Sequence, residues 1–85
     1  MPRAVYRRTV PPTSLQETFG LAVRKLRQDA GMSQEQLAES AGLERAYVSA
    51  LERGRRNPTL LTQQKVAGAL HVRLAEVIDA AERMG

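Results

Sequence analysis

The segment from residue 33 to residue 54, SQEQLAESAGLERAYVSALERG, contains two short helical patterns separated by a glycine. Counted from Gln34 as the first position, the fifth, ninth, fifteenth and eighteenth positions are Ala38, Gly42, Val48 and Leu51. Alanine at the fifth position lets two helices approach closely, and glycine at the ninth takes a left-handed turn without strain. Val48 and Leu51 then fill the wedge between the helices. The segment therefore predicts two packed helices joined by a tight turn.

Helical patterns also fill the rest of the chain after residue 13. We expect helices over about 14–30, 33–41, 45–53, 59–70 and 74–83, and no strand pattern competes with them. Ser14 with Glu17, and Ser33 with Gln36, have the spacing of capping boxes, and Gly31 and Gly54 are expected left-handed stops. Thr59 is the expected cap of the fourth helix. The predicted fold class is an all-α bundle of five helices.

Apolar residues at helical spacing define the expected core. These positions are Leu15, Phe19, Ala22, Val23, Leu26, Ala30, Leu37, Ala41, Val48, Leu51, Leu60, Val66, Ala67, Leu70, Leu74, Val77, Ile78 and Ala81. Phe19 is the single phenylalanine and is predicted to anchor this core. A chain of 85 residues forms one small domain of modest stability, which a dimer would reinforce.

Residues 1–13 differ from the domain that we expect over 14–85. They contain three prolines and three arginines, no acidic residue and little apolar periodicity, which predicts a flexible basic arm. The chain carries a net charge of +4, from 13 basic and 9 acidic residues, and a second basic group lies at Arg45, Arg53, Arg55 and Arg56. Such a surplus attracts polyanions. The arm either enters a DNA minor groove or makes no contact with DNA.

Composition excludes several classes of protein. With no cysteine and one histidine, His71, the chain has no expected metal site or cofactor, and no pair of residues suits catalysis. No segment resembles a membrane span or a secretory signal, so a soluble cytoplasmic protein is expected. The length leaves no room for an effector pocket or a small-molecule ligand. We therefore expect that the protein is not an enzyme and that it binds a macromolecular partner.

The helix expected over residues 45–53 has a narrow basic outer face. Positions i, i+1, i+4, i+5 and i+8 of this helix are Arg45, Ala46, Ser49, Ala50 and Arg53. A helix that enters the major groove of DNA needs a slim side with polar groups for the base edges. Arginine can bond guanine O6 and N7 together, and alanine can contact a thymine methyl. These five residues are the candidate base readers.

The stretch LERAYVSALERGRRNP, residues 43–58, resembles the phage-repressor type of helix-turn-helix domain, the Xre-like or lambda-repressor-like family, and the resemblance covers residues 15–81. It implies a sequence-specific transcriptional regulator that binds double-stranded DNA. It also implies that Glu52 pairs with Arg27. The chain departs from the family pattern at Glu44, at Gln63 and Gln64, and at His71, where glycine is common.

Other candidates for DNA contact lie around these readers. Gln34, at the start of a helix, is expected to bind a phosphate, and Arg53, Arg56 and Asn57 are expected to clamp the backbone. The alternatives are a plain first-turn glutamine at position 34 and solvated loop residues at the other three positions. Tyr47 lies between the buried and exposed faces, so its ring is expected to pack while its hydroxyl faces phosphate or base, unless it serves packing alone.

The expected assembly is a homodimer on a near-palindromic operator. The predicted interface is formed by the last two helices through Val77, Ile78 and Ala81, because so short a terminal helix cannot bury them alone. Size and motif are similar to those of restriction-modification controller proteins that regulate their own operons. The alternatives are an antitoxin of a toxin–antitoxin pair and a protein-interaction adaptor that does not read DNA.

Overall fold

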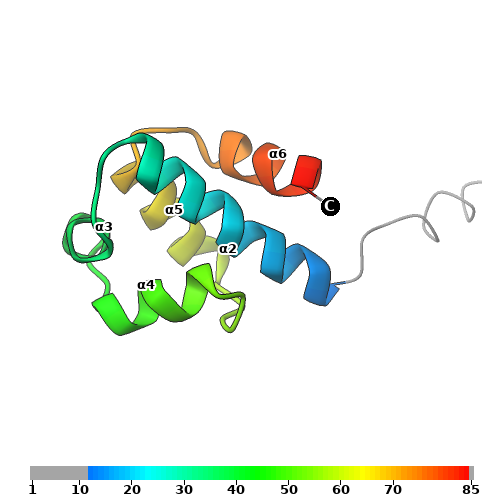
Figure 1. Ribbon diagram of the computed structural model, residues 1–85, viewed down its shortest axis with the longest axis horizontal. Helices are drawn as coiled ribbons and strands as arrows, with labels where there is room; N and C mark the ends of the chain where they lie inside the picture. Colours follow the sequence, from blue (N-terminus) through cyan, green and yellow to red (C-terminus); the bar gives the residue numbers. More distant parts are fainter. Residues whose placement is uncertain (1–11, 85) are drawn as a thin grey trace, which may run out of the picture.

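The computed structural model describes residues 12–84, and the side chains of residues 15–84. This part of the chain forms five helices and no strand: α2 (Pro12–Asp29), α3 (Gln34–Ala41), α4 (Arg45–Glu52), α5 (Leu60–Ala69) and α6 (Leu74–Met84). The long helix α2 crosses the molecule, with α6 along one side and α4 on the other (Figure 1). Helix α3 packs against α4 and α5, so the expected all-α class is confirmed.

Helix α2 begins two residues earlier than the sequence predicted. Its first residue is Pro12, so Ser14 lies inside the first turn, and the expected capping box of Ser14 with Glu17 is wrong. Proline suits a first helical turn because its φ is already helical and its missing N–H has no partner to lose there. The predicted boundary of the arm at residue 13 therefore falls within α2. Residues 1–11 of the predicted arm lie outside the described residues.

Four helix ends share one hydrogen-bonding pattern. Gly31, Gly42 and Gly54 have φ values of +70°, +70° and +75°, as expected for left-handed stops. At each of them the glycine N–H and the next N–H return to carbonyls of the last turn, which is the Schellman arrangement. His71 closes α5 in the same way, with a φ of +61°. The links between helices are therefore defined by local backbone bonds.

The helix starts agree with two of the predicted caps. Ser33 Oγ accepts the N–H of Gln36 at 3.0 Å, and Gln36 Oε1 accepts the N–H of Ser33 at 2.8 Å, so this capping box is complete. Thr59 Oγ1 accepts the N–H of Thr62 at 3.1 Å. These bonds satisfy first-turn donors that a helix cannot pair internally.

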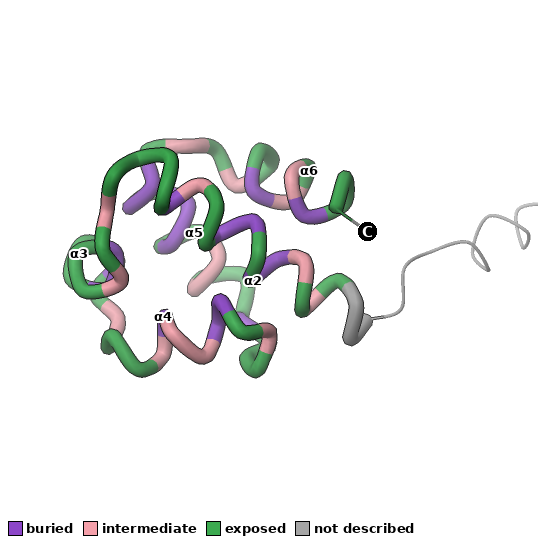
Figure 2. The backbone as a smooth tube through the Cα atoms, in the orientation of Figure 1, coloured by how far each residue is buried: buried purple, intermediate pink, exposed green. Residues whose placement is uncertain are grey.

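Buried apolar residues from all five helices form one core. Figure 2 marks the buried positions along the backbone of each helix. The buried hydrophobic residues are Phe19, Ala22, Val23, Leu37, Ala38, Ala41, Val48, Leu51, Val66, Ala67, Ala69, Leu70, Val77 and Ala81. Three predicted core positions are wrong, because Leu15, Ala30 and Leu60 are exposed. Leu15 lies near the free end of α2, Ala30 follows its last residue, and Leu60 is the first residue of α5. Helix ends extend beyond the packed layer, which explains all three.

Helix α6 packs its apolar face on α2. Val77 and Ala81 are fully buried within the chain, so they cannot form the dimer interface that the sequence predicted. Ile78 is half-buried and lines a hollow with Phe19 and Pro58. Helix α2 spans 18 residues and is long enough to cover the face that α6 alone would leave open.

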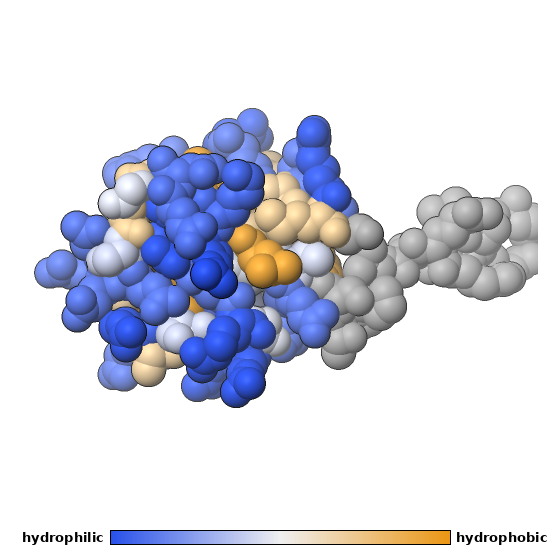
Figure 3. All heavy atoms as spheres, in the orientation of Figure 1, coloured by the Kyte–Doolittle hydropathy of each residue, from blue (hydrophilic) through white to orange (hydrophobic). Residues whose placement is uncertain are grey.

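The surface around this core is largely polar. Figure 3 shows hydrophilic residues over most of one face, with hydrophobic ones visible where α2 and α6 lie side by side. Within residues 12–84, no helix is long and apolar enough to cross a membrane. The exposed large hydrophobic residues of the described chain are Leu15, Leu21, Leu60, Leu61 and Met84.

Candidate DNA-binding surface

Helix α4 has one face in the core and one face toward solvent. Val48 and Leu51 lie on the inner face and are fully buried. The five predicted readers all lie on the accessible side: Arg45, Ala46 and Arg53 are exposed, and Ser49 and Ala50 are half-buried. The exposure pattern thus matches the predicted outer face. Two arginines, Arg45 and Arg53, and the small side chains between them leave this side slim enough for a groove.

The start and end of α4 differ in how they are held. Glu44 takes the N-cap position, but its exposed side chain makes no capping hydrogen bond. The first turn of α4 therefore keeps free N–H groups next to Arg45. At the other end, Arg53 Nη1 donates to Ser49 Oγ at 2.7 Å, so two of the predicted readers already contact each other. This contact is on the surface and leaves the remaining Arg53 donors available.

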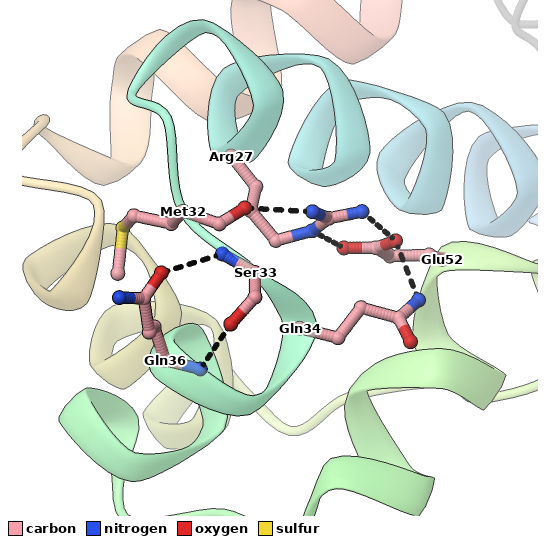
Figure 4. Close-up of polar contacts among 6 residues, drawn as sticks. All are labelled: Arg27, Met32, Ser33, Gln34, Gln36 and Glu52. Atoms are coloured by element: carbon pink, nitrogen blue, oxygen red, sulfur yellow. Dashed lines mark hydrogen bonds and ion pairs between the residues drawn. The ribbon is translucent and has the colours of Figure 1, made fainter.

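A buried ion pair connects α4 to α2, as the family resemblance implied. Arg27 Nε and Nη2 donate to the two carboxylate oxygens of Glu52 at 2.6 and 3.0 Å, and Arg27 Nη1 donates to the carbonyl of Met32 at 2.8 Å (Figure 4). The Glu52 side chain is only 3% exposed. The hydrogen bond with Glu52 raises the pKa of the Arg27 guanidinium. The guanidinium of Arg27 therefore stays charged, and its two bonds to Glu52 fix the end of α4.

Gln34 lies next to this pair and not free in solvent. It is the first residue of α3, it is half-buried, and its Nε2 donates to Glu52 Oε1 at 3.0 Å (Figure 4). The sequence predicted the position of Gln34 at the helix start but not this partner, which lies 18 residues away. Because Ser33 takes the N–H of Gln36, the first-turn N–H groups that remain are those of Gln34 and Glu35.

The loop after α4 is tied down at both ends by glutamine side chains. Gln16 Nε2 donates to the carbonyl of Gly54 at 2.9 Å, and Gln63 Nε2 donates to the carbonyl of Pro58 at 3.2 Å. Neither bond was predicted, although Gln63 stood out as a polar residue where the family is more apolar. Pro58 is buried, which fixes the loop further. The residues between these anchors, 55–57, are therefore presented on a defined backbone.

Two of the predicted clamps, Arg56 and Asn57, lie on this loop, and the third, Arg53, is the exposed C-cap residue of α4. Arg55, Arg56 and Asn57 are exposed. The guanidinium of Arg56 lies over the ring of Tyr47, 5.3 Å from its centre, which is a cation–π distance. Tyr47 is half-buried and packs against the core, as its intermediate position predicted. Its ring thus supports Arg56 beside the outer face of α4.

Sequence reasoning missed Gly20, the residue on which α4 rests. A Cβ at this position would lie 2.2 Å from the carbonyl oxygen of Leu51 and 3.0 Å from that of Glu52. The backbones of α2 and α4 therefore meet directly, and a side chain would push α4 outward. The helical pattern around residue 20 contains no sign of this contact, because the two carbonyls come from a distant part of the chain.

The arrangement of α3, the turn at Gly42 and α4 matches a known family model. The model described as HTH_3, helix-turn-helix, aligns with residues 23–77, from the middle of α2 into α6. This chain belongs to the HTH_3 helix-turn-helix family. The match includes Val48 and Leu51, the buried residues of α4, and the residues of its outer face.

Named relatives of this HTH_3 protein are regulators. The control protein C.BamHI of Bacillus amyloliquefaciens is 42% identical over 62 residues, which are 72% of this chain and 76% of the relative. The immunity repressor protein of Bacillus phage phi105 is 39% identical over 61 residues, which are 72% of this chain. The aligned residues span 42% of the length of that repressor.

A solved structure gives the same result. The restriction-modification controller protein C.AhdI from Aeromonas hydrophila is 44% identical, with a TM-score of 0.72, and the alignment covers 73% of this chain and 94% of that one. The HTH_3 family is a DNA-binding family and not an enzymatic one. This HTH_3 protein is accordingly a DNA-binding transcriptional regulator.

Proposed function

We propose that the protein is a homodimeric regulator that binds a near-palindromic operator and places one α4 helix per protomer in the major groove. The observation that carries this proposal is the division of α4 into a fully buried side, Val48 and Leu51, and an accessible side with Arg45 and Ala46. A two-fold dimer presents two such helices to half-sites about 34 Å apart. Because the proposed ligand is double-stranded DNA, we place the protein in the cytoplasm.

Each part of the surface has a separate role in this proposal. Arg45, Ala46, Ser49 and Ala50 read base edges, with Arg45 bonding a guanine and an alanine contacting a thymine methyl. Arg53, Arg56 and Asn57 hold the phosphate backbone on one side of α4, and Gln34 holds it on the other. The hydroxyl of Tyr47 faces the same backbone. The anchored loop supports these roles because it holds two of the clamps at fixed positions.

We propose that the dimer contact lies on α5 and the start of α6. Leu60 and Leu61 are 71% and 60% exposed, and they line an apolar groove with Gln64, Gly68, Val72 and Leu74. Exposed leucines on a groove are typical of a surface that another copy covers. This surface replaces the interface at Val77 and Ala81, which the buried core rules out.

The regulatory setting that we propose is control of the protein's own operon, in the manner of a restriction-modification controller. Two relatives carry that description in their names, C.BamHI as a control protein and C.AhdI as a restriction-modification controller. Placing the operator upstream of a reporter gene, with and without the protein, measures both the direction of regulation and its dependence on protein concentration. A reporter that responds only to a second protein would contradict control by concentration alone.

Selection of bound sequences from a random DNA pool defines the operator, and two variants then test the roles. Arg45→Ala is expected to flatten the preference at one base pair per half-site, with a loss of about 1–3 kcal/mol in discrimination. Arg56→Ala is expected to weaken binding to all DNA sequences alike. It should also reduce the slope of log affinity against log salt concentration, the salt slope, by about one per lost phosphate contact.

Arg83→Ala is the matched control, since Arg83 is an exposed arginine on α6 that pairs with Asp79. It should bind as the unchanged protein does. Equal losses on operator and random duplex for Arg45→Ala would show that Arg45 does not read a base.

A further inference from the structure

Glu52 is an acidic residue on the helix that contacts DNA, yet its carboxylate is directed away from solvent. Both of its oxygens are bonded to Arg27, and Oε1 also accepts from Gln34. Arg27 is itself 11% exposed at its side chain, so the two opposite charges lie together inside the protein. The pair presents no net charge to a nearby phosphate, which removes the repulsion that a lone carboxylate would cause.

The hydrogen bond to Glu52 determines whether the nitrogen or the oxygen of the Gln34 amide faces the carboxylate. An ionised carboxylate only accepts hydrogen bonds, so the amide must turn its nitrogen toward it. Figure 4 shows the Gln34 nitrogen facing Glu52 and the oxygen turned away. The nitrogen carries two N–H groups, and Glu52 Oε1 occupies one of them. The second N–H is held in a fixed direction beside the first turn of α3.

We propose that Glu52 is a positioning residue for DNA binding, which orients the amide of Gln34 so that its second N–H donates to a phosphate oxygen. This inference rests on the proposed phosphate contact of Gln34. A phosphate, like a carboxylate, only accepts hydrogen bonds, so an amide that turned over would present its oxygen and lose the contact. Arg27 and Glu52 thus connect the core of the protein to the DNA backbone through one neutral side chain.

The test is a double-substitution cycle on the duplex selected from the random pool. Gln34→Leu removes the amide, and Glu52→Met removes both carboxylate oxygens, and with them the acceptor of Gln34, while keeping a side chain of similar length. Each single variant is expected to bind that duplex about tenfold more weakly, the range of one hydrogen bond to a charged group. The double variant is expected to bind no more weakly than Gln34→Leu alone, because Glu52 acts through Gln34.

Two further readouts separate positioning from stability. Urea unfolding measures how much each single variant and the double variant destabilise the fold, and affinities are compared at a temperature where circular dichroism shows each variant folded. The salt slope should not change in Gln34→Leu, since a neutral amide releases no counterion. If the affinity losses of the two single variants multiplied in the double variant, Glu52 would not act through Gln34. That result would overturn the inference but would leave the phosphate contact of Gln34 in place.

The unsubstituted protein gives an answer that does not depend on the folding of a variant. In nuclear magnetic resonance spectra, one of the two side-chain amide protons of Gln34 should shift strongly when the operator duplex is added, and the other should stay. If both protons shift alike, or neither shifts, the orientation by Glu52 is wrong. Unchanged affinity in Gln34→Leu would remove the phosphate contact as well, while base reading by Arg45 would still stand on its own test.

Discussion

His71 occupies a backbone conformation that favours glycine. Its φ of +61° brings its Cβ close to the following carbonyl, and the same position at three other helix ends of this chain is glycine. Its N–H and that of Val72 complete the same pair of bonds to the last turn of α5. The end of α5 is therefore held by the backbone bonds of residues 71 and 72, and these bonds do not require a side chain at position 71.

His71→Gly is expected to raise the free energy of unfolding by about 0.5–1 kcal/mol, since it relieves the left-handed strain and loses part of that gain to the freedom of glycine in the unfolded chain. Urea denaturation followed by circular dichroism measures the change. His71→Ala removes the imidazole but keeps the Cβ, so it should remain near the unchanged protein. Equal stabilisation by both substitutions would assign the effect to the imidazole.

Single residues show where sequence reasoning succeeds. Gly31, Gly42 and Gly54 were predicted because a glycine after a helical pattern is a local signal. The bond from Gln34 to Glu52 was not predicted, because it depends on how α3 and α4 pack across 18 residues of sequence. Local backbone conformation can therefore be predicted from the sequence, whereas side-chain partners that are distant in sequence cannot.

At the scale of the helices, the contact of α2 with α4 controls how far α4 stands from the core. Gly20 permits the carbonyls of Leu51 and Glu52 to touch the backbone of α2. One turn earlier on α2, Gln16 holds Gly54. Helix α2 thus supports the whole end of α4 and the loop that follows it.

Gly20→Ala is expected to destabilise the protein by about 1–3 kcal/mol, because the added methyl would overpack against carbonyl oxygens that cannot move away alone. Operator affinity should fall with it, since α4 shifts. Thermal unfolding and binding titrations measure the two effects. Gly68→Ala is the comparison for stability alone, because Gly68 lines the proposed dimer groove. Within the protomer a Cβ there meets open space, so the better helix propensity of alanine should stabilise α5 by about 1 kcal/mol. If Gly20→Ala stabilised the fold as Gly68→Ala does, the close contact would be disproved.

Helix α6 illustrates what an amphipathic pattern leaves open. The spacing of Val77, Ile78 and Ala81 correctly predicted one apolar face, but it does not say which surface covers that face. The structure assigns it to α2. The helix limits were predicted to within about two residues for the same reason that the caps were, since both depend on near neighbours.

At the scale of the whole molecule, an apolar groove is left on the surface of α5 and α6. Its rim includes Leu60 and Leu61, the two most exposed large hydrophobic residues of the described chain. A dimer formed through this groove would bury them and double the number of DNA contacts. Assembly and operator affinity are then linked.

Leu60→Asp is expected to shift the protein toward monomer in sedimentation experiments at micromolar concentrations, because a charge on the groove would be desolvated in the dimer. Operator binding should weaken and become more dependent on protein concentration. Leu21→Asp is the control, since Leu21 is 48% exposed on α2 and does not line the groove. A dimer that persisted in Leu60→Asp would place the interface on another surface.

The outer face of α4 takes no part in the core that holds this protein together. Exchanges at exposed positions away from buried contacts usually change stability by no more than about 0.5 kcal/mol. Arg45 and Ala46 can therefore be replaced without disturbing the fold behind them. New target preferences can accumulate on this scaffold one residue at a time, and a library randomised at these places should consist mostly of well-folded members.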